Sequence, residues 1–167
     1  MKMANGSFAA SKGMTMVEVL LSSVIIILVF AAIFAIYIFV QNTWQQGYAV
    51  MKLERDASIA MEKMARGIDG QNGIREAKYI DSPNDGATAS TISFTGIDDV
   101  VRTFSRSVAD STLRYDEGLG QSIIAENVSS LTFSRTNNLI TINLILEEII
   151  RGKHFNVSLM TSVRLRN

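Results

Sequence analysis

Cysteine, histidine and surplus charge are scarce in this chain, and each scarcity removes a class of site. The 167 residues include no cysteine, so neither a disulfide framework nor a thiolate metal site can form. The one histidine, His154, is too few for a histidine-rich metal centre. The formal net charge is zero, which argues against a strongly basic nucleic-acid-binding face. We therefore expect no nucleic-acid partner.

Catalytic sequence patterns are also missing. The chain has no glycine-rich phosphate loop, and no serine in a nucleophile elbow that could work with His154. We interpret His154, next to the Gly152-Lys153 turn, as an ordinary surface histidine. Asp98-Asp99 is interpreted as a turn and Glu147-Glu148 as a solvated strand end. Neither is interpreted as a carboxylate pair for acid–base chemistry, because adjacent strand side chains point to opposite faces. The sequence predicts that the protein is not an enzyme.

One long apolar run dominates what the chain does contain. No charged residue lies between Glu18 and Lys52, and only Ser22 and Ser23 interrupt the hydrophobic set from Val19 to Val40. As a helix, this run extends about 33 Å, which is enough to cross a hydrocarbon core of about 30 Å. The run is therefore predicted to span a membrane.

The residues around the run favour one orientation and disfavour one kind of signal. Lys2 and Lys12 precede the run, so the positive-inside rule places the N-terminus in the cytoplasm and the chain after Val40 across the membrane. A secretory signal peptide needs a shorter core and a small-residue cleavage site, which Gln41-Asn42-Thr43-Trp44 does not offer. Two interpretations remain: a plain signal anchor, and an anchor that is cleaved before the apolar run.

A short basic leader ends in glycine, and a single glutamate follows at the mouth of the apolar run. The stretch reads Gly13-Met14-Thr15-Met16-Val17-Glu18-Val19-Leu20-Leu21. It resembles the class III signal of type IV prepilins and type II secretion pseudopilins, in which prepilin peptidase cuts after the glycine and methylates the new N-terminal amine. The resemblance implies cleavage between Gly13 and Met14, N-methylation of Met14 and an assembly role for Glu18. Met14 departs from the family pattern, in which phenylalanine is commoner at the first residue after the cut.

The resemblance also implies a function, partners and a location. It implies a structural filament subunit in the bacterial inner membrane, single-pass, with a cytoplasmic N-terminus and a periplasmic or extracellular head. Its partners would be other pilin or pseudopilin subunits, prepilin peptidase, the inner membrane and the assembly platform. Segments of the head, such as Ser162 to Arg166, more loosely resemble minor subunits of the type II secretion J-like or type IV pilus W-like kind. Which of these machines it serves stays open.

The carboxylate of Glu18 can also be explained from physical chemistry. A charge inside a membrane span costs about 2.5 to 3.5 kcal/mol, and an unpaired N-terminal ammonium at similar depth is also unfavourable. Pairing the two, within one chain or between neighbouring chains, removes both penalties. The alternative is that Glu18 reaches the membrane interface from a plain anchor helix.

The helix is predicted to continue past the membrane, from Thr15 to Arg66, because no proline interrupts it and Gly67 and Gly70 then break it. Beyond the span, apolar residues recur at three- and four-residue steps: Val50, Leu53, Ala57, Ala60, Met61, Met64 and Ile68. This face should be covered, with Met51, Met61 and Met64 as core contacts. Trp44 and Tyr48 are expected either at the membrane interface or packed against the head.

Short β-prone runs separated by polar turns follow the helix. They are Thr91–Thr95, Val100–Ser107, Thr112–Tyr115, Gln121–Ala125, Leu131–Thr136, Leu139–Leu146 and Phe155–Leu165. Asn137-Asn138 suits a tight hairpin turn, since asparagine tolerates positive φ. The predicted fold is α+β, a long helix packed on an antiparallel sheet. The predicted division is a leader (1–13), a transmembrane helix (14–40), an amphipathic helix (41–68) and a β-rich head (69–167).

Two further interpretations stay open at this stage. Asp81, Asn84 and Asp85 could present oxygens to calcium, as heads of some members of the resembled family do, but their loop lacks EF-hand spacing and its residues are those of any turn. We therefore predict no cofactor, with calcium as a minor alternative. The main alternative function is a single-pass anchored binding domain that never polymerises. An anchored enzyme would need a convergent polar pocket that the sequence does not indicate.

Overall fold

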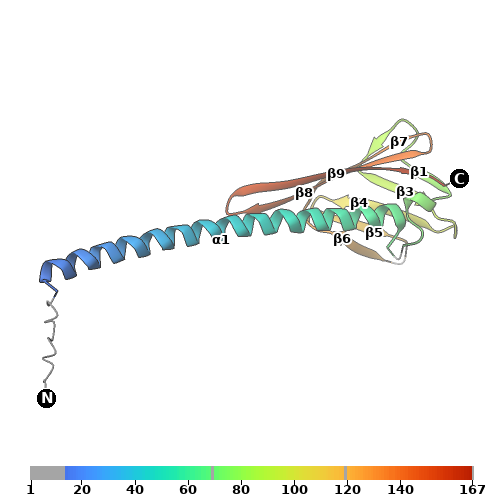
Figure 1. Cartoon of the computed structure of the whole chain (residues 1–167). Coiled ribbons are helices and arrows are strands. Elements are labelled where there is room, and N and C mark those ends of the chain that lie inside the picture. Colours follow the sequence, from blue (N-terminus) through green and yellow to red (C-terminus); the bar gives the residue numbers. More distant parts are fainter. Residues whose placement is uncertain (1–13, 69, 119, 167) are drawn as a thin grey trace, which may run out of the picture. The chain divides into compact units, whose positions relative to one another are not determined.

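The protein is described by a computed structural model over residues 14–68, 70–118 and 120–166. It consists of one long helix, α1 (Met16–Arg66), and two antiparallel β-sheets (Figure 1). The α+β fold predicted from the sequence is confirmed. The chain divides into two compact units between Trp44 and Gln45, called the stem and the head below.

Both ends of α1 follow from local sequence. Thr15 precedes its first residue, and Gly67 follows its last with a φ of +94°. A Cβ atom at Gly67 would lie 1.7 Å from the carbonyl oxygen of Gln71, so the close turn requires glycine. The amide of Gly67 still donates to the carbonyl of Lys63 at 2.8 Å, which closes the last turn of the helix.

The head contains the two sheets. The first has the order β1-β3-β4-β5-β6, formed by β1 (Tyr79–Ser82), β3 (Thr91–Thr95), β4 (Val101–Ser107), β5 (Thr112–Asp116) and β6 (Gln121–Ala125). The second has the order β2-β7-β8-β9, formed by β2 (Thr88–Ala89), β7 (Val128–Thr136), β8 (Leu139–Ile150) and β9 (Lys153–Arg164). A short 3-10 helix, η1 (Ile74–Glu76), joins α1 to the first sheet. All strand pairs are antiparallel.

One hydrophobic core joins the head part of α1 to both sheets. The helix contributes Leu53, Ala57, Ala60, Met61 and Met64, all buried. The second sheet contributes the alternating row Ile140, Ile142, Leu144 and Leu146. The predicted amphipathic face is therefore covered as expected.

Several residues that were predicted to be covered along the helix are exposed in the structure. Met51 is 62% exposed, so its prediction as a core contact is wrong; it lies about 200° around the helix from buried Leu53. Ile68 lies beyond the end of α1 and is exposed, so it does not extend the buried face. Tyr48 is exposed and does not pack in the head core. Trp44, in the stem, is also exposed.

All seven predicted strands are present, as β3 to β9, but not every boundary was predicted correctly. The turn at Asn137 has a φ of 53°, and Thr136 pairs with Leu139 across it, so the predicted hairpin is confirmed. β8 continues to Ile150, so Glu147-Glu148 lies within the strand and not at its end. The local run of two carboxylates suggested an end, but pairing with β9 extends the strand past it.

The head has two sheets where one was expected, and its short strands β1 and β2 were not predicted. Two arginines connect the sheets through hydrogen bonds to backbone carbonyls. Arg106 of β4 donates to Val128 of β7 at 2.8 Å, and Arg135 of β7 donates to Ile80 of β1 at 3.0 Å. Each of these bonds links one sheet directly to the other.

Candidate functional site

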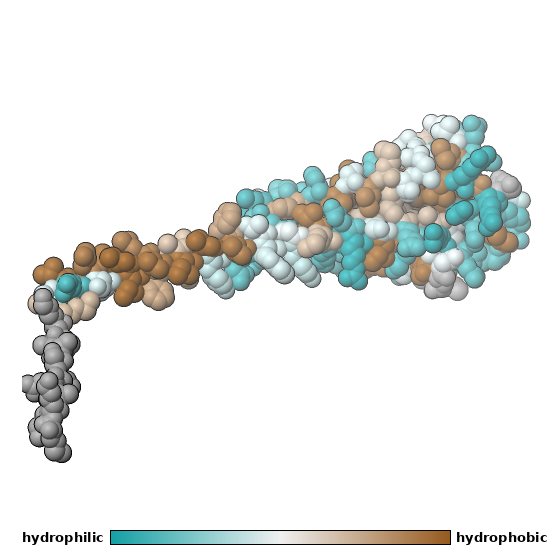
Figure 2. Space-filling view, in the orientation of Figure 1, coloured by the Kyte–Doolittle hydropathy of each residue, from teal (hydrophilic) through white to brown (hydrophobic). Residues whose placement is uncertain are grey.

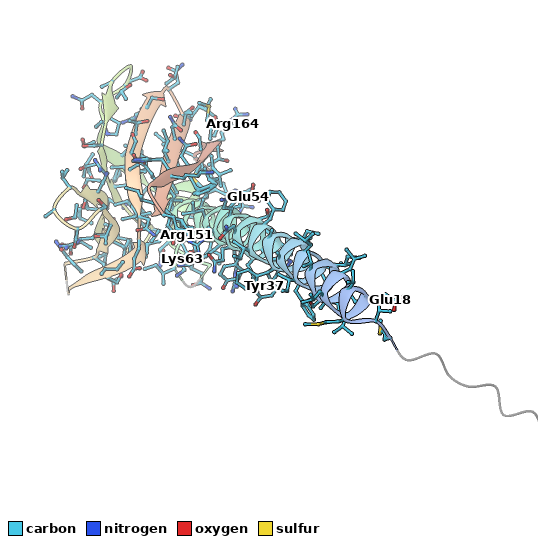
Figure 3. The ribbon with its side chains drawn as sticks, turned by 90° about the vertical axis from the view of Figure 1, so that its left-hand side faces the viewer. Glu18, Tyr37, Glu54, Lys63, Arg151 and Arg164 are labelled. Carbon is cyan, nitrogen blue, oxygen red and sulfur yellow. The ribbon has the colours of Figure 1, made fainter. Side chains whose placement is uncertain are left out.

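Glu18 lies in the first turn of α1 (Figure 3). A reciprocal pair of hydrogen bonds between Thr15 and Glu18 closes this turn. The Oε2 atom of Glu18 accepts from the Thr15 amide at 2.8 Å and from the Thr15 hydroxyl at 3.0 Å. The Thr15 hydroxyl oxygen accepts from the Glu18 amide at 3.3 Å. This is a capping box, in which the residue before the helix and the third helical residue satisfy each other's amides.

The capping box places the predicted processing site just outside the helix. Met14 is 66% exposed and precedes Thr15, while Gly13 lies outside the described residues. A cut between Gly13 and Met14 would leave both partners of the capping box on the remaining chain. The new amine would lie one residue before the helix cap.

The Glu18 carboxylate is only partly used by the cap. Its Oε2 atom accepts both bonds from Thr15, and its Oε1 atom accepts none from the described part of the chain. A negative charge in the first turn also interacts favourably with the helix dipole. Glu18 therefore has a local structural role, and one oxygen left for a further donor.

Beyond Glu18, the stem is an apolar helix with its side chains uncovered (Figure 2). Four consecutive residues, Val24 to Ile27, are each more than half exposed, so every side of the helix is apolar and open. The hydroxyls of Ser23 and Thr43 bond to backbone carbonyls of the preceding turn, at 2.8 and 3.0 Å. By length and composition this helix can cross a membrane, and none of the residues in its most apolar 18-residue stretch is buried.

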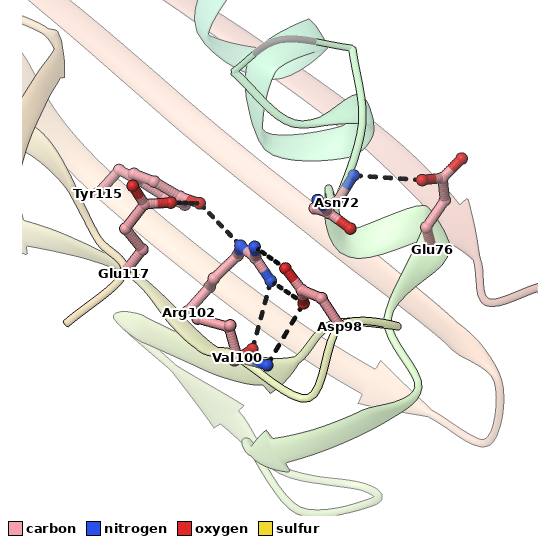
Figure 4. Close-up of polar contacts among 7 residues, drawn as sticks. All are labelled: Asn72, Glu76, Asp98, Val100, Arg102, Tyr115 and Glu117. Atoms are coloured by element: carbon pink, nitrogen blue, oxygen red, sulfur yellow. Dashed lines mark hydrogen bonds and ion pairs between the residues drawn. The ribbon is translucent and has the colours of Figure 1, made fainter. Parts of the chain in front are cut away.

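Among the described residues of the head, one cation is buried: Arg102 of β4, which is held by Asp98, Val100 and Tyr115 (Figure 4). Its two terminal nitrogens donate to the two carboxylate oxygens of Asp98 at 2.7 and 2.5 Å. Its Nε atom donates to the Tyr115 hydroxyl at 3.0 Å, and that hydroxyl donates to Glu117 at 3.1 Å. Gly96 makes room for the pair, since a Cβ atom there would lie 2.3 Å from the guanidinium.

Hydrogen bonding and burial shift the pKa values of the groups in this cluster. Hydrogen bonds from Arg102 lower the pKa of Asp98 to about 2, and Asp98 raises the pKa of Arg102. Burial raises the pKa of Tyr115. An open cleft of about 390 Å³ lies next to the cluster, lined by Asn72, Glu117, Gln121, Ser122 and their neighbours. Arg102 donates four hydrogen bonds within the protein, and through them the cluster links the Gly96–Val100 turn to β5.

The calcium candidates each have hydrogen-bond partners within the protein. Asp81 lies in β1 and accepts from the Thr95 hydroxyl at 3.1 Å. Asp85 accepts from the Asn137 amide at 2.6 Å, and the carbonyl of Asn84 accepts from Ala87 at 3.0 Å. Within the described ranges, no three His, Asp or Glu side chains are grouped to hold a metal ion.

His154 lies on β9 and contacts Glu147 of β8, with 2.5 Å between its Nδ1 atom and a carboxylate oxygen. The hydrogen bond from His154 lowers the pKa of Glu147. The His154 side chain is 62% exposed, as expected for a surface histidine. The neighbouring Glu148 turns toward the core side of β8, and its Oε2 atom has no partner in the described part of the protein.

Sequence reasoning missed two residues, Thr15 and Arg102. The spacing of Thr15 and Glu18, a threonine three residues before a glutamate at the start of an apolar run, is a capping-box pattern that could have been found. Arg102 shares the inward face of β4 with Phe104, where an apolar residue is expected. The one signal in the sequence for a buried arginine was Asp98, its ion-pair partner four residues earlier.

No protein-family model, no curated protein and no solved structure matches this chain. The candidate site is defined by its own geometry: a capped carboxylate at the start of an exposed apolar helix.

Proposed function

We propose that this chain is a non-catalytic subunit of a membrane-borne filament, a minor pilin of a type IV pilus or a minor pseudopilin of a type II secretion pseudopilus. The observation that carries the proposal is the stem, an apolar helix exposed on every side with one capped carboxylate at its start. The resemblance of Gly13 to Leu21 to a prepilin signal points the same way.

The open apolar surface needs cover in both states of such a subunit. In the bacterial inner membrane, lipid tails surround residues 19–40, with the N-terminus cytoplasmic and the head periplasmic or extracellular. In a filament, the stems of neighbouring subunits replace the lipid. A helix that is apolar all round is suited to both environments, because it has no polar face that either would leave unsolvated.

Glu18 then sets the register between neighbours. Cleavage after Gly13 by prepilin peptidase removes Lys2 and Lys12 and creates a methylated ammonium at Met14. The Oε1 atom of Glu18, free of the cap, accepts from the ammonium of a neighbouring subunit. In an apolar environment this pairing removes two costly unpaired charges, so it favours one alignment of the stems.

Two variants separate the charge of Glu18 from its capping role. Glu18→Gln keeps a capping-box side chain and loses the charge, whereas Thr15→Ala keeps the charge and loses the cap. A charge-assisted hydrogen bond contributes about 1.5 to 3 kcal/mol, so we expect Glu18→Gln to lower the yield of sheared filaments about tenfold or more. Thr15→Ala should assemble nearly as well as the wild type, and both variants should insert and be processed.

Equal assembly by Glu18→Gln and the wild type would contradict the pairing role. An equal loss in both variants would assign the effect to the helix cap instead.

The main competing function is an anchored binding domain that never polymerises. Because the chain has no cysteine, single cysteines at Val29 and Ile33 would be unique crosslinking sites in the stem. A filament subunit should give stem-to-stem adducts in the membrane fraction, and a cysteine at exposed Thr136 in the head serves as the control. Absence of stem adducts at both positions would favour the anchored binding domain.

A further inference from the structure

The two sheets of the head have four edge strands, and one of them differs from the rest. β2 has two residues, β1 has four and β6 has five. The pairings of β1 and β6 are both interrupted by a register shift. The fourth edge, β9, has twelve residues and pairs with β8 without interruption from Lys153 to Arg164 (Figure 1). It is the long, regular edge among the described strands.

β9 also lacks prolines, bulges and mid-strand charges, three of the features that usually protect an edge. Natural proteins shield exposed edges with prolines, bulges, covering segments or charges along the strand. β9 has no proline and no charged residue from Phe155 to Val163. Its solvent-side residues Asn156, Ser158, Met160 and Ser162 are all exposed, with Met160 at 71%.

The outer backbone groups of β9 are open to a partner. Every second residue of an edge strand directs its N–H and C=O away from the ladder. In the described part of the chain, no backbone hydrogen bond outside the ladder involves residues 153–164. A strand of this length therefore offers a row of donors and acceptors about 40 Å long.

The charges of β9 lie at its two ends and have the same sign. Lys153 faces Ile150 across the ladder, and Arg164 faces Leu139. Neither forms an ion pair with a described residue. A complementary strand would therefore have an uncharged centre and carboxylates about eleven residues apart.

We propose that β9 is a strand-addition edge, which binds an extended segment of a different protein with an uncharged centre and an acidic residue near each end. The backbone row supplies the affinity, and the two terminal cations select the partner and its register. A second copy of this chain fits less well, because antiparallel pairing of two β9 strands would place Lys153 opposite Arg164. The proposal concerns the head and does not depend on assembly through the stem.

The test uses the full chain in the membranes of its own cells. A photo-crosslinking amino acid, p-benzoylphenylalanine, replaces Asn156, Ser158, Met160 or Ser162 in turn, and mass spectrometry maps the adducts. If a strand adds to β9, all four positions should label one segment of one protein, with the labelled residue moving by two for each step along β9. The same label at Thr103 in a central strand, and at Ile123 on the β6 edge, is the control.

Charge reversal tests the selection of the partner. Lys153→Glu and Arg164→Glu should each lower the Met160 adduct about fivefold, the effect of an exposed ion pair turned into a repulsion. Arg55→Glu, an exposed cation on α1, should leave the adduct unchanged. No adduct, adducts scattered over unrelated segments, or adducts with β9 of a second copy would each overturn the proposal.

Discussion

The stem and the head contain the same kinds of apolar side chain in opposite situations. Phe30 in the stem is 68% exposed, while Phe104 in the head is fully buried, with its ring centroid 5.0 Å from that of Tyr115 and 6.0 Å from that of Phe94. The head satisfies its apolar surface internally. The stem leaves its apolar surface exposed, so composition alone does not distinguish a buried side chain from an exposed one.

The two regions also differ in how they hold charge. Between Met14 and Trp44 the stem has one charged side chain, that of Glu18. The helix cap uses one of the two carboxylate oxygens of Glu18. The head holds its buried Arg102 through four hydrogen bonds to Asp98, Val100 and Tyr115. The buried charge in the head is held by the residues around it, whereas the charge in the stem has one carboxylate oxygen that accepts no hydrogen bond from the described part of the chain.

The largest difference should come from removing one phenylalanine in each region. Phe104→Ala leaves a cavity in a packed core and should destabilise the head by about 3 to 5 kcal/mol. Phe30→Ala removes an exposed ring and should leave head stability unchanged. Denaturant unfolding of the detergent-solubilised full chain, followed by near-ultraviolet circular dichroism, measures both. Equal effects would mean that the stem side chain is packed and that the contrast between the regions is wrong.

A smaller effect is expected from the polar cluster of the head. Arg102→Ala leaves the buried Tyr115 hydroxyl without its donor, which should cost about 1 to 3 kcal/mol. Arg55→Ala, at an exposed cation of α1, is the matched control and should stay within about 0.5 kcal/mol of the wild type. If Arg102→Ala unfolds at the wild-type denaturant concentration, the cluster does not stabilise the head.

The smallest effect should appear in the pH dependence of Asp98. Its pKa falls from 3.8 to about 2 in the folded head, so its stabilising contribution is present above about pH 4 and is lost as the pH falls toward 2. Because the side chain is 40% exposed, solvent screening keeps this contribution small. The melting temperatures of the wild type and Asp98→Asn should therefore differ above pH 4 and converge near pH 2. A gap that stays constant with pH would contradict the pairing.

The sequence predicted the helix best and the assembly of the sheets least well. α1 was predictable because its apolar run, its amphipathic period and the terminating Gly67 are all local signals. The extension of β8 through Glu147-Glu148 was not, because it depends on pairing with β9. The inward position of Arg102 was missed for a related reason, since its partners Asp98 and Tyr115 come together only in the folded sheet. Met51 was assigned to the core although its helical position is opposite Leu53.

The candidate site was predicted in its residues but not in its local geometry. Glu18 was singled out because a carboxylate at the mouth of an apolar run is unfavourable without a partner. The capping bond from Thr15 supplies a partner within the chain, so the assembly role now concerns the remaining oxygen of Glu18. Gly13 lies outside the described residues, and the processing prediction stays open.

The most direct test of the central claim is N-terminal mass spectrometry of the full protein purified from membranes. A processed filament subunit should begin at Met14 and carry a single methyl group on its amine. A chain that retains residues 1–13, or that begins at any other residue, would contradict the account of the stem as a processed assembly helix.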